Sequence, residues 1–367
     1  MTPHHPSSVC SIIPPHVLSR LAEEGGADVR ESALRSLATS AALRARRAAL
    51  APELRRLGIG VADLAFLAPT YAHHNRVYDA RHGGDSDLPG ELRRSDDGPA
   101  SDDSAVNEAF DGAEKTYAFY RDVLKRESID DAGLELVSSV HFDVRLDNAF
   151  WNGAQMCYGD GGGGMLVPGS LTGCLDVIGH ELTHGVTQYT ANLNYRKQSG
   201  ALNESFSDVF GILVKQYSSG TSAAEADWLI GEGIMTPEMG GNALRSMKAP
   251  GTAFRYDSQP ATMDDYADLP DDGDPRNDNG GVHINSGIPN HAFYLAATAL
   301  GGNAWETVGP IWYDALTTRL QTDSRFTDAA AATVASAEAL RGKDSVEAEA
   351  VRSAWSTVKV ELVASKA

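Results

Sequence analysis

The sequence predicts an α+β protein with two lobes, the first rich in β-strands and the second α-helical, preceded by a short helical segment. Short β-like runs punctuated by Gly and Asn, such as VSSVHFDVRL and GAQMCYGD, lie between Leu136 and Val167. Helical patterns dominate from Leu175 onward, as in GALNESFSDVFGILVKQY and PNHAFYLAATAL. The two halves join near residue 190, and a cleft between lobes is a common place for a ligand site.

The pattern of elements divides the 367 residues into three parts. Leucines recur at mostly helical intervals over 28–57, and Pro52 is expected to break this run into two helices. Polar, Gly-rich sequence over 73–103 predicts a loop or an exposed hairpin, and apolar residues spaced by three and four predict a helix over 106–125. We therefore expect a leading segment 1–65, a β-rich domain 66–190 and an α-helical domain 191–367.

Charge and composition exclude several classes of partner. The net charge of −19 disfavours nucleic acid and anionic membrane, whose phosphates would be repelled. No apolar run reaches the roughly 18 residues that span a membrane. Residues 1–60 carry eight Arg against five Asp and Glu, whereas the rest is acidic, so the leading segment is expected to dock on the body. Three cysteines (Cys10, Cys157 and Cys174) make a poor disulfide framework.

The strongest local signal is the run HELTH, which holds His180, Glu181 and His184. On a helix, residues i and i+4 share one face, about 6 Å apart along the axis. Two imidazoles placed in this way can converge on one metal ion, and the Glu between them points toward the open side of the metal. The five residues alone also occur as ordinary surface polarity in unrelated proteins, so they need support from a further ligand.

A catalytic zinc needs a third protein ligand and an open position for water. The run GALNESFSD supplies Glu204, 20 residues after His184, which leaves room for a loop and a second helix. Asp208 lies at i+4 from Glu204 and can accept a hydrogen bond from the far nitrogen of a ligand imidazole. The alternative is a solvated acidic face, but apolar neighbours such as Phe206 and Phe210 indicate a buried helix, where an unpaired carboxylate is costly.

With these residues in view, the sequence resembles the thermolysin family of metallopeptidases, and within it the protealysin-like subgroup with short propeptides. The resemblance covers nearly the whole chain. It is carried by five ordered blocks: DNAFWNGAQMCYGDG (147–161), DVIGHELTHGVTQYTANLNY (176–195), SGALNESFSD (199–208), ALRSM (243–247) and DNGGVHINSGIPNHAFYL (278–295). Such a set is far more specific than the HExxH pattern alone, and it implies zinc held by His180, His184 and Glu204.

The resemblance also implies roles for residues around the reacting bond. His283 would donate to the developing oxyanion, with Asp278 orienting its ring, and Tyr195 would supply a second donor. Donors of this kind are each worth about 100–1,000-fold in rate. Asn148 and the backbone beside it at Ala149 would hold the main chain of the substrate as an added edge strand.

The residues that follow the reacting bond are implied in the same way. Arg245 would bind the carbonyl after the scissile bond. Leu171, Val177 and Leu244 would form an apolar pocket, so cleavage before bulky hydrophobic residues is expected. Glu181 would act as the general base, taking a proton from water and passing it to the leaving amine without a covalent intermediate.

The chain departs from the family at the place where long thermolysin-like enzymes bind two calcium ions. Asp176, Asp227 and Glu232 match the acidic cluster, but Lys215 stands where a bridging Glu is expected and Leu229 replaces another acid. A lysine ammonium can neutralise the remaining carboxylates directly. We therefore expect one catalytic zinc ion and loss of the paired calcium site.

The run CSIIPPHVL, residues 10–18, resembles the short-propeptide motif of the subgroup. Pro14 and Pro15 are expected to stiffen it into an extended form that lies in the cleft and resists cleavage. Two hypotheses apply to Cys10. Its thiolate fills the open position of zinc, or it is a small residue packed against the catalytic domain.

The function that follows is a zinc-dependent neutral endopeptidase of protein or peptide substrates, made as a precursor inhibited by its own propeptide. A binding protein on an inactive scaffold need not keep the ligands together with Glu181, Tyr195 and His283, and the NAFWN block disfavours another substrate class. We expect a monomer. From its composition, we expect the N-terminal segment to act without a standard signal peptide. The resemblance implies secretion by a leaderless route, and the alternative is a cytoplasmic enzyme.

Overall fold

A six-stranded sheet forms the first lobe of the computed structural model, which describes residues 10–56 and 74–362. The expected boundary near residue 65 lies outside the described residues. Along the sheet the strands are β1 (Cys10–Ser11), β5 (Ala149–Trp151), β6 (Met156–Tyr158), β4 (Leu136–Val140), β2 (Asn75–Asp79) and β3 (Glu91–Ser95). Strands β6, β4 and β2 are mutually parallel, and the other neighbours pair antiparallel. The first strand therefore comes from the leading segment.

Helix α4 (Ser104–Leu124) covers the sheet and confirms the helix expected over 106–125. Its apolar side, with Val106 and Phe110, is buried, and the N-cap Asp103 accepts a hydrogen bond from the Ala105 amide. The expected hairpin is also present, because β2 pairs antiparallel with β3.

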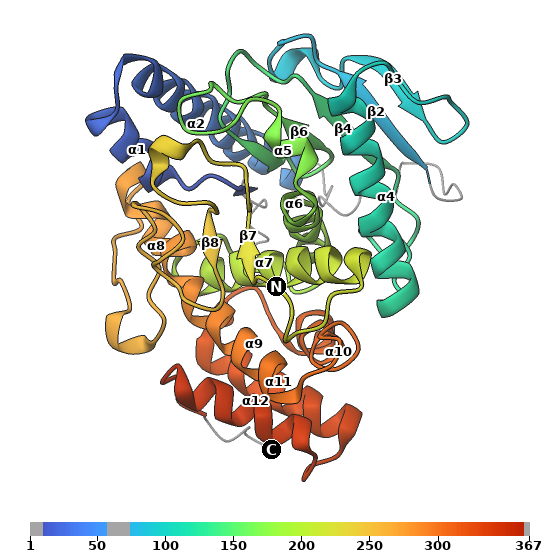
Figure 1. Ribbon diagram of the computed structural model, residues 1–367, viewed down its shortest axis with the longest axis vertical. Helices are drawn as coiled ribbons and strands as arrows, with labels where there is room; N and C mark the ends of the chain where they lie inside the picture. Colours follow the sequence, from blue (N-terminus) through green and yellow to red (C-terminus); the bar gives the residue numbers. More distant parts are fainter. Residues whose placement is uncertain (1–9, 57–73, 363–367) are drawn as a thin grey trace.

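Helices α6 (Leu175–Gln188) and α7 (Lys197–Ser219) pack against each other in the middle of the molecule (Figure 1). Two glycines allow the close approach: a Cβ at Gly179 would lie 3.1 Å from the Gly211 Cα, and one at Gly211 would lie 2.5 Å from the Asp176 carbonyl oxygen. Larger side chains at this crossing would push the two helices apart. The glycines therefore let α6 and α7 approach closely enough for side chains of one helix to contact those of the other.

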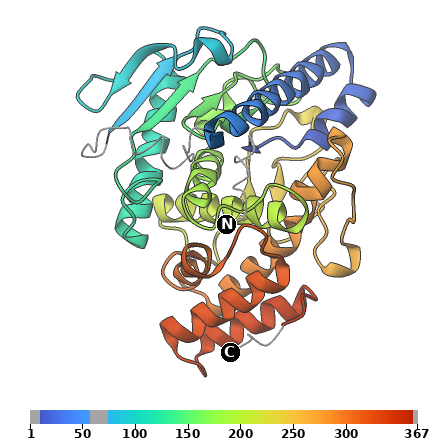
Figure 2. The same ribbon diagram turned by 180° about the vertical axis from the view of Figure 1, so that it is seen from behind.

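The second lobe is helical and confirms the predicted two-lobed α+β fold. Figures 1 and 2 show its last helices as a layer beyond α7, on the side away from the sheet. Its helices are α8 (Asp278–Asn285), α9 (Gly287–Leu300), α10 (Gly309–Asp314), α11 (Phe326–Arg341) and α12 (Val346–Thr357). Outside the leading segment, the other elements of the described chain are α5 (Ser170–Gly173), the two-stranded sheet β7 (Leu229–Ile230) and β8 (Arg245–Ser246), four 3₁₀ turns (Asp85–Asp87, Pro237–Met239, Met263–Asp265 and Pro275–Asn277) and a π-helical turn (Ala315–Arg319).

The leading segment differs from its sequence prediction in two places. Helix α2 (Ala27–Arg56) continues through Pro52, so the expected break is wrong. An interior proline removes one backbone hydrogen bond, and the helix tolerates that loss here. Helix α1 (Pro15–Glu24) begins at Pro15, so only Pro14 of the pair keeps the expected extended conformation. Proline suits the first helical position because the missing N–H has no partner there.

Helix α2 docks on the body through hydroxyl groups. Ser32 donates to the Asp147 carboxylate and to the Arg145 carbonyl, and the Asp147 amide donates to Ser36 Oγ. Ser32 and Ser36 are buried, and Leu43 packs in a small apolar cluster with Phe142, Phe150 and other residues. The expected docking of the leading segment therefore occurs through hydrogen bonds and packing.

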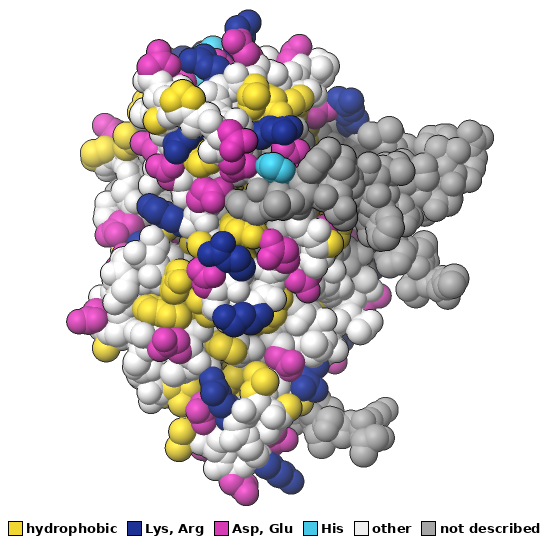
Figure 3. All heavy atoms as spheres, turned by 90° about the vertical axis from the view of Figure 1, so that its right-hand side faces the viewer, with side chains coloured by type: hydrophobic (Ala, Val, Ile, Leu, Met, Phe, Trp, Pro, Cys, Tyr) yellow, Lys and Arg dark blue, Asp and Glu magenta, His cyan; other side chains and the backbone are white. Residues whose placement is uncertain are grey.

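One face of the molecule mixes both signs of charge. In the face shown in Figure 3, acidic and basic side chains are interspersed and hydrophobic side chains form small groups. Within residues 10–56 and 74–362, no helix is both long and apolar enough to cross a bilayer.

Candidate active site

Three side chains from α6 and α7 converge on one buried point. His180 Nε2 lies 3.0 Å from His184 Nε2 and 3.5 Å from Glu204 Oε2, and His184 Nε2 lies 3.5 Å from Glu204 Oε1. Glu204 Oε2 is buried and makes no hydrogen bond within the described part of the chain. Two imidazoles and one carboxylate form a ligand set suited to zinc, so these residues fit a metal ion.

Buried partners fix the far nitrogen of each imidazole. His180 Nδ1 lies 2.8 Å from Asp208 Oδ1, and His184 Nδ1 lies 2.8 Å from Asn203 Oδ1. Asp208 in turn accepts hydrogen bonds from the Arg245 guanidinium at 2.7 and 2.9 Å and from the Asn290 side-chain amide at 2.8 Å. These contacts turn both Nε2 atoms inward. The sequence analysis missed Asn203 and Asn290, and the only signal for Asn203 is that each ligand histidine needs a partner.

The pKa shifts around the three side chains follow from burial and from their mutual charges. Burial lowers the pKa of His184 to about 3, which leaves its imidazole neutral. Burial disfavours the charged form of Glu204, but His283, His184 and His180 outweigh it and lower its pKa to about 2. Burial likewise opposes protonation of His180, but Asp208 and Glu204 raise its pKa to about 9.

Glu181 lies beside the three side chains on α6 and is fully buried. The Trp151 amide donates to its Oε2 at 2.9 Å, whereas Oε1 has no hydrogen-bond partner in the described chain. Burial raises the pKa of Glu181 to about 8. A carboxylate with this proton affinity suits general-base chemistry near neutral pH.

His283 and Tyr195 face the same point from the helical lobe. His283 Nδ1 lies 2.6 Å from Asp278 Oδ1, and the His283 amide donates to Asp278 Oδ2 at 2.7 Å. Burial opposes protonation of His283, but Asp278 and Glu204 outweigh it and raise its pKa. The Tyr195 hydroxyl donates to Glu204 and lies 3.1 Å from His283 Nε2. His16, from α1, lies 3.7 Å from Asp278 and was not anticipated.

The leading segment occupies the residues expected to bind substrate. The Ile12 amide donates to the Ala149 carbonyl at 3.1 Å, and the Ile13 amide donates to Asn148 Oδ1 at 3.0 Å. Arg245 Nη1 donates to the Ile12 carbonyl at 3.2 Å. Strand β1 thus extends the sheet at its β5 edge.

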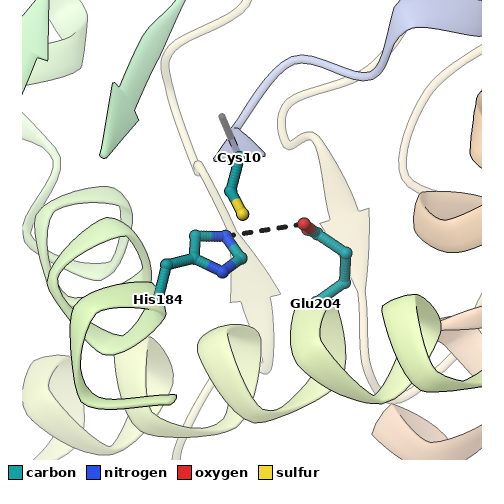
Figure 4. A group of neighbouring side chains, drawn as sticks. All are labelled: Cys10, His184 and Glu204. Atoms are coloured by element: carbon teal, nitrogen blue, oxygen red, sulfur yellow. Dashed lines mark ion pairs between the residues drawn. The ribbon is translucent and has the colours of Figure 1, made fainter. Parts of the chain in front are cut away.

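Cys10 reaches the convergence point of the three side chains. Its Sγ, one nitrogen of His184 and one oxygen of Glu204 all lie within 4.8 Å of one another, and Figure 4 shows the sulfur pointing toward the imidazole ring. The three apolar residues expected to form a pocket, Leu171, Val177 and Leu244, are all buried.

Lys215 lies among the acidic residues that match the calcium cluster. Its Nζ is 2.8 Å from Asp227, 3.4 Å from Asp176 and 3.8 Å from Glu232. Burial opposes its protonation, but these carboxylates outweigh it and raise its pKa. An ammonium group therefore occupies the centre of the cluster.

Comparisons with known proteins identify the family. The profile described as "Thermolysin metallopeptidase, catalytic domain" matches residues 64–188, and the one described as "Thermolysin metallopeptidase, alpha-helical domain" matches 191–360. The chain belongs to the thermolysin family of metallopeptidases. It is a peptide hydrolase of the metalloendopeptidase type, as the sequence predicted.

Several relatives of this thermolysin-family chain align over most of its length. An "Extracellular metalloprotease" of Pectobacterium carotovorum is 41% identical over 96% of this chain and 97% of its own. "Protease PrtS" of Photorhabdus is 44% identical over 79% of this chain and 77% of its own. The solved precursor of protealysin from Serratia proteamaculans is 43% identical, with a TM-score of 0.82, and covers 96% of this chain and 100% of its own. These matches bear out the resemblance to the protealysin-like subgroup.

Proposed function

We propose that the protein is a zinc-dependent neutral endopeptidase that cleaves before bulky hydrophobic residues and is made as a self-inhibited precursor. The observation that carries the proposal is the convergence of His180, His184 and Glu204, with both imidazoles oriented by buried partners. When bound there, zinc would polarise the peptide carbonyl and lower the pKa of water. The remaining steps belong to side chains of the chain itself.

Glu181 is the proposed general base. Its Oε2 is held by the Trp151 amide, which leaves Oε1 to take a proton from the attacking water and to return it to the leaving nitrogen. His283 and Tyr195 are the proposed donors to the oxygen on which negative charge develops. Asp278 fixes the His283 ring by accepting from Nδ1, so Nε2 faces the reacting carbonyl.

Asn148, Ala149 and Arg245 are the proposed groups that hold the substrate backbone. Their contacts with Ile12 and Ile13 support this role, because a bound peptide would offer the same amides and carbonyls. The buried aliphatic side chains of Leu171, Val177 and Leu244 support a preference for bulky hydrophobic residues after the scissile bond.

Residues 1–65 are the proposed inhibitory propeptide. Until it is removed, this segment would keep substrates from the edge of β5. Secretion is proposed because a relative bears the name extracellular metalloprotease. Calcium at the paired site is proposed to be absent, since Lys215 supplies the positive charge there.

Digestion of casein by the trimmed protein tests the proposal. We expect cleavage that a zinc chelator abolishes and that added zinc restores. Sequencing of the new N-termini should find Leu, Ile, Phe or Val at the first position. Activity that survives full removal of the metal would contradict the zinc assignment, and N-termini without an apolar bias would contradict the specificity.

A further inference from the structure

The leading segment pairs with β5 as a strand of defined register. Cys10 lies opposite Trp151 and Ser11 opposite Phe150 in antiparallel pairing. The pairing continues beyond β1, where the Ile12 amide donates to the Ala149 carbonyl. Because successive residues of a strand alternate in direction, this register decides which peptide bond reaches the catalytic groups.

Two carbonyl groups locate that bond. The Ser11 carbonyl oxygen lies 3.0 Å from His283 Nε2, the proposed donor to the oxyanion. The next carbonyl, that of Ile12, accepts from Arg245 at 3.2 Å, as expected for the carbonyl after the scissile bond. The bond between Ser11 and Ile12 therefore lies where a substrate bond would be cleaved.

We propose that Ser11–Ile12 is a latent scissile bond, bound in the direction of a substrate, and that the Cys10 thiolate protects it by occupying the open position of the metal. The inference rests on the proposed zinc site and deepens it. Of the two hypotheses on Cys10, ligation of the metal is the one proposed here. Ligation also explains why the segment is not cleaved while it lies in the active site.

The geometry of Cys10 supports ligation. Its side chain is buried, and Sγ lies within 4.8 Å of ligand atoms of both His184 and Glu204 (Figure 4). A second observation points to a cation at the same place, since the buried Glu204 Oε2 makes no hydrogen bond within the described residues. Thiolate is a common zinc ligand, and a zinc ion with four protein ligands has no position for water.

On ligation, the Cys10 thiol releases one proton to solvent, and the water molecule that it displaces leaves the site. Without the sulfur, water would add to the Ser11 carbonyl carbon. The bond to the Ile12 nitrogen would break, and that nitrogen would take the proton. Pro14 and Pro15 lie beyond Ile13, so they do not shield the Ser11–Ile12 bond itself.

A spectroscopic experiment tests the ligand without any need for activity. The full chain carrying Glu181→Ala, which prevents self-cleavage, is loaded with cobalt(II) in place of zinc. We expect a near-ultraviolet thiolate-to-cobalt charge-transfer band, its loss in Cys10→Ser, and its retention in the matched control Cys174→Ser. Equal cobalt content in all three chains without a band would overturn the ligation. Failure of all three chains to bind cobalt would instead refute the proposed metal site, and the ligation with it.

A cleavage experiment tests the register. The full-length Cys10→Ser chain with Glu181 intact is followed by mass spectrometry from the earliest time points. We expect a new N-terminus at Ile12 that wild type and Cys174→Ser do not produce. Early cuts at other bonds while Ser11–Ile12 stays whole would overturn the latent-substrate register. Casein digestion by the trimmed wild type, measured in parallel, reports on the proposed function separately.

Discussion

Two groups of charged side chains are built around the same pair of helices, α6 and α7, and differ in how their charge is balanced. Around Glu204, two imidazole Nε2 atoms point inward and one carboxylate oxygen makes no hydrogen bond in the described chain. Around Asp176, the Lys215 ammonium lies between three carboxylates. A built-in cation makes the second group structural. The first group fits a metal ion, and the side chains proposed to act in catalysis surround it.

The largest effects should follow from changes in the metal group. Glu181→Ala should retain zinc and fold but lose about 100–10,000-fold in kcat, because a general base is removed and no ligand is lost. Glu204→Ala should lose the zinc itself. Metal analysis of both purified proteins beside their peptidase rates checks the contrast. Substantial activity in a clean Glu181→Ala preparation would contradict the assignment, as would full zinc content in Glu204→Ala.

A smaller effect is expected at Asn203, which holds the His184 ring from outside the ligand set. Asn203→Ala should weaken zinc binding by about 10–100-fold, because His184 Nδ1 then keeps only the Ser207 hydroxyl, at 3.0 Å, of the two groups that fix the ring. Competition with a chelator of known affinity measures the change. Asn203→Asp, which keeps an acceptor oxygen, is the matched control and should bind more tightly than the alanine variant. Equal affinities would show that the Asn203 contact does not orient the ligand.

The convergence of His180, His184 and Glu204 could be predicted from the sequence because the spacing within each helix is local. His180 and His184 are four residues apart on one helix, and so are Glu204 and Asp208 on the next. The contacts of Asn203 and of the Trp151 amide could not be predicted in this way. They depend on how closely α6 approaches α7 and β5. Glycines at the crossing permit this approach, but the periodicity of the sequence does not predict it.

The leading segment was predictable in outline only. Its docking follows from charge and from the resemblance, but the register of β1 on β5 depends on backbone hydrogen bonds that any side chain allows. The start of α1 at Pro15 and the continuation of α2 through Pro52 were misjudged for a related reason. Proline excludes one donor, and the surrounding structure decides whether that loss ends a helix, starts one or is tolerated.

The Lys215 group offers a direct way to exchange one kind of cation for the other. Lys215→Met should lower the free energy of unfolding by about 2 kcal/mol, because the buried Asp176 carboxylate loses its nearest cation. Lys215→Glu should be destabilised as well but regain stability with millimolar calcium, whereas wild type should not respond. Denaturant unfolding with and without calcium measures both effects. Lys359→Met, which breaks an exposed ion pair with Asp264, is the control and should change stability by less than about 1 kcal/mol. A large rise in the stability of wild type on adding calcium would contradict the view that Lys215 takes the place of calcium in this group.

A third group shows a built-in cation that pH can remove. His141, just after β4, lies between Asp160, 2.8 Å from Nδ1, and the α4 N-cap Asp103, 2.8 Å from Nε2. The hydrogen bond to Asp160 is the main cause of the raised pKa, burial opposes it, and the hydrogen bond to Asp103 adds to it, so the pKa of His141 reaches about 9. The charged imidazole thus ties the end of β4 to α4 and to the loop after β6.

Because the folded pKa of His141 lies above the ordinary value of 6.5, its contribution to stability is complete below pH 6.5 and disappears as pH rises through about 9. In the Glu181→Ala background, which prevents self-digestion, His141→Gln should therefore be less stable by about 2 kcal/mol near pH 6, a figure reduced for the solvent screening of a partly exposed ion pair, and nearly equal well above pH 9. Denaturant unfolding of both chains across this range measures the difference. Asp160→Asn should flatten the same dependence, since it removes the main partner of the cation. A difference between His141→Gln and its parent that stays constant with pH would mean that His141 acts by packing alone.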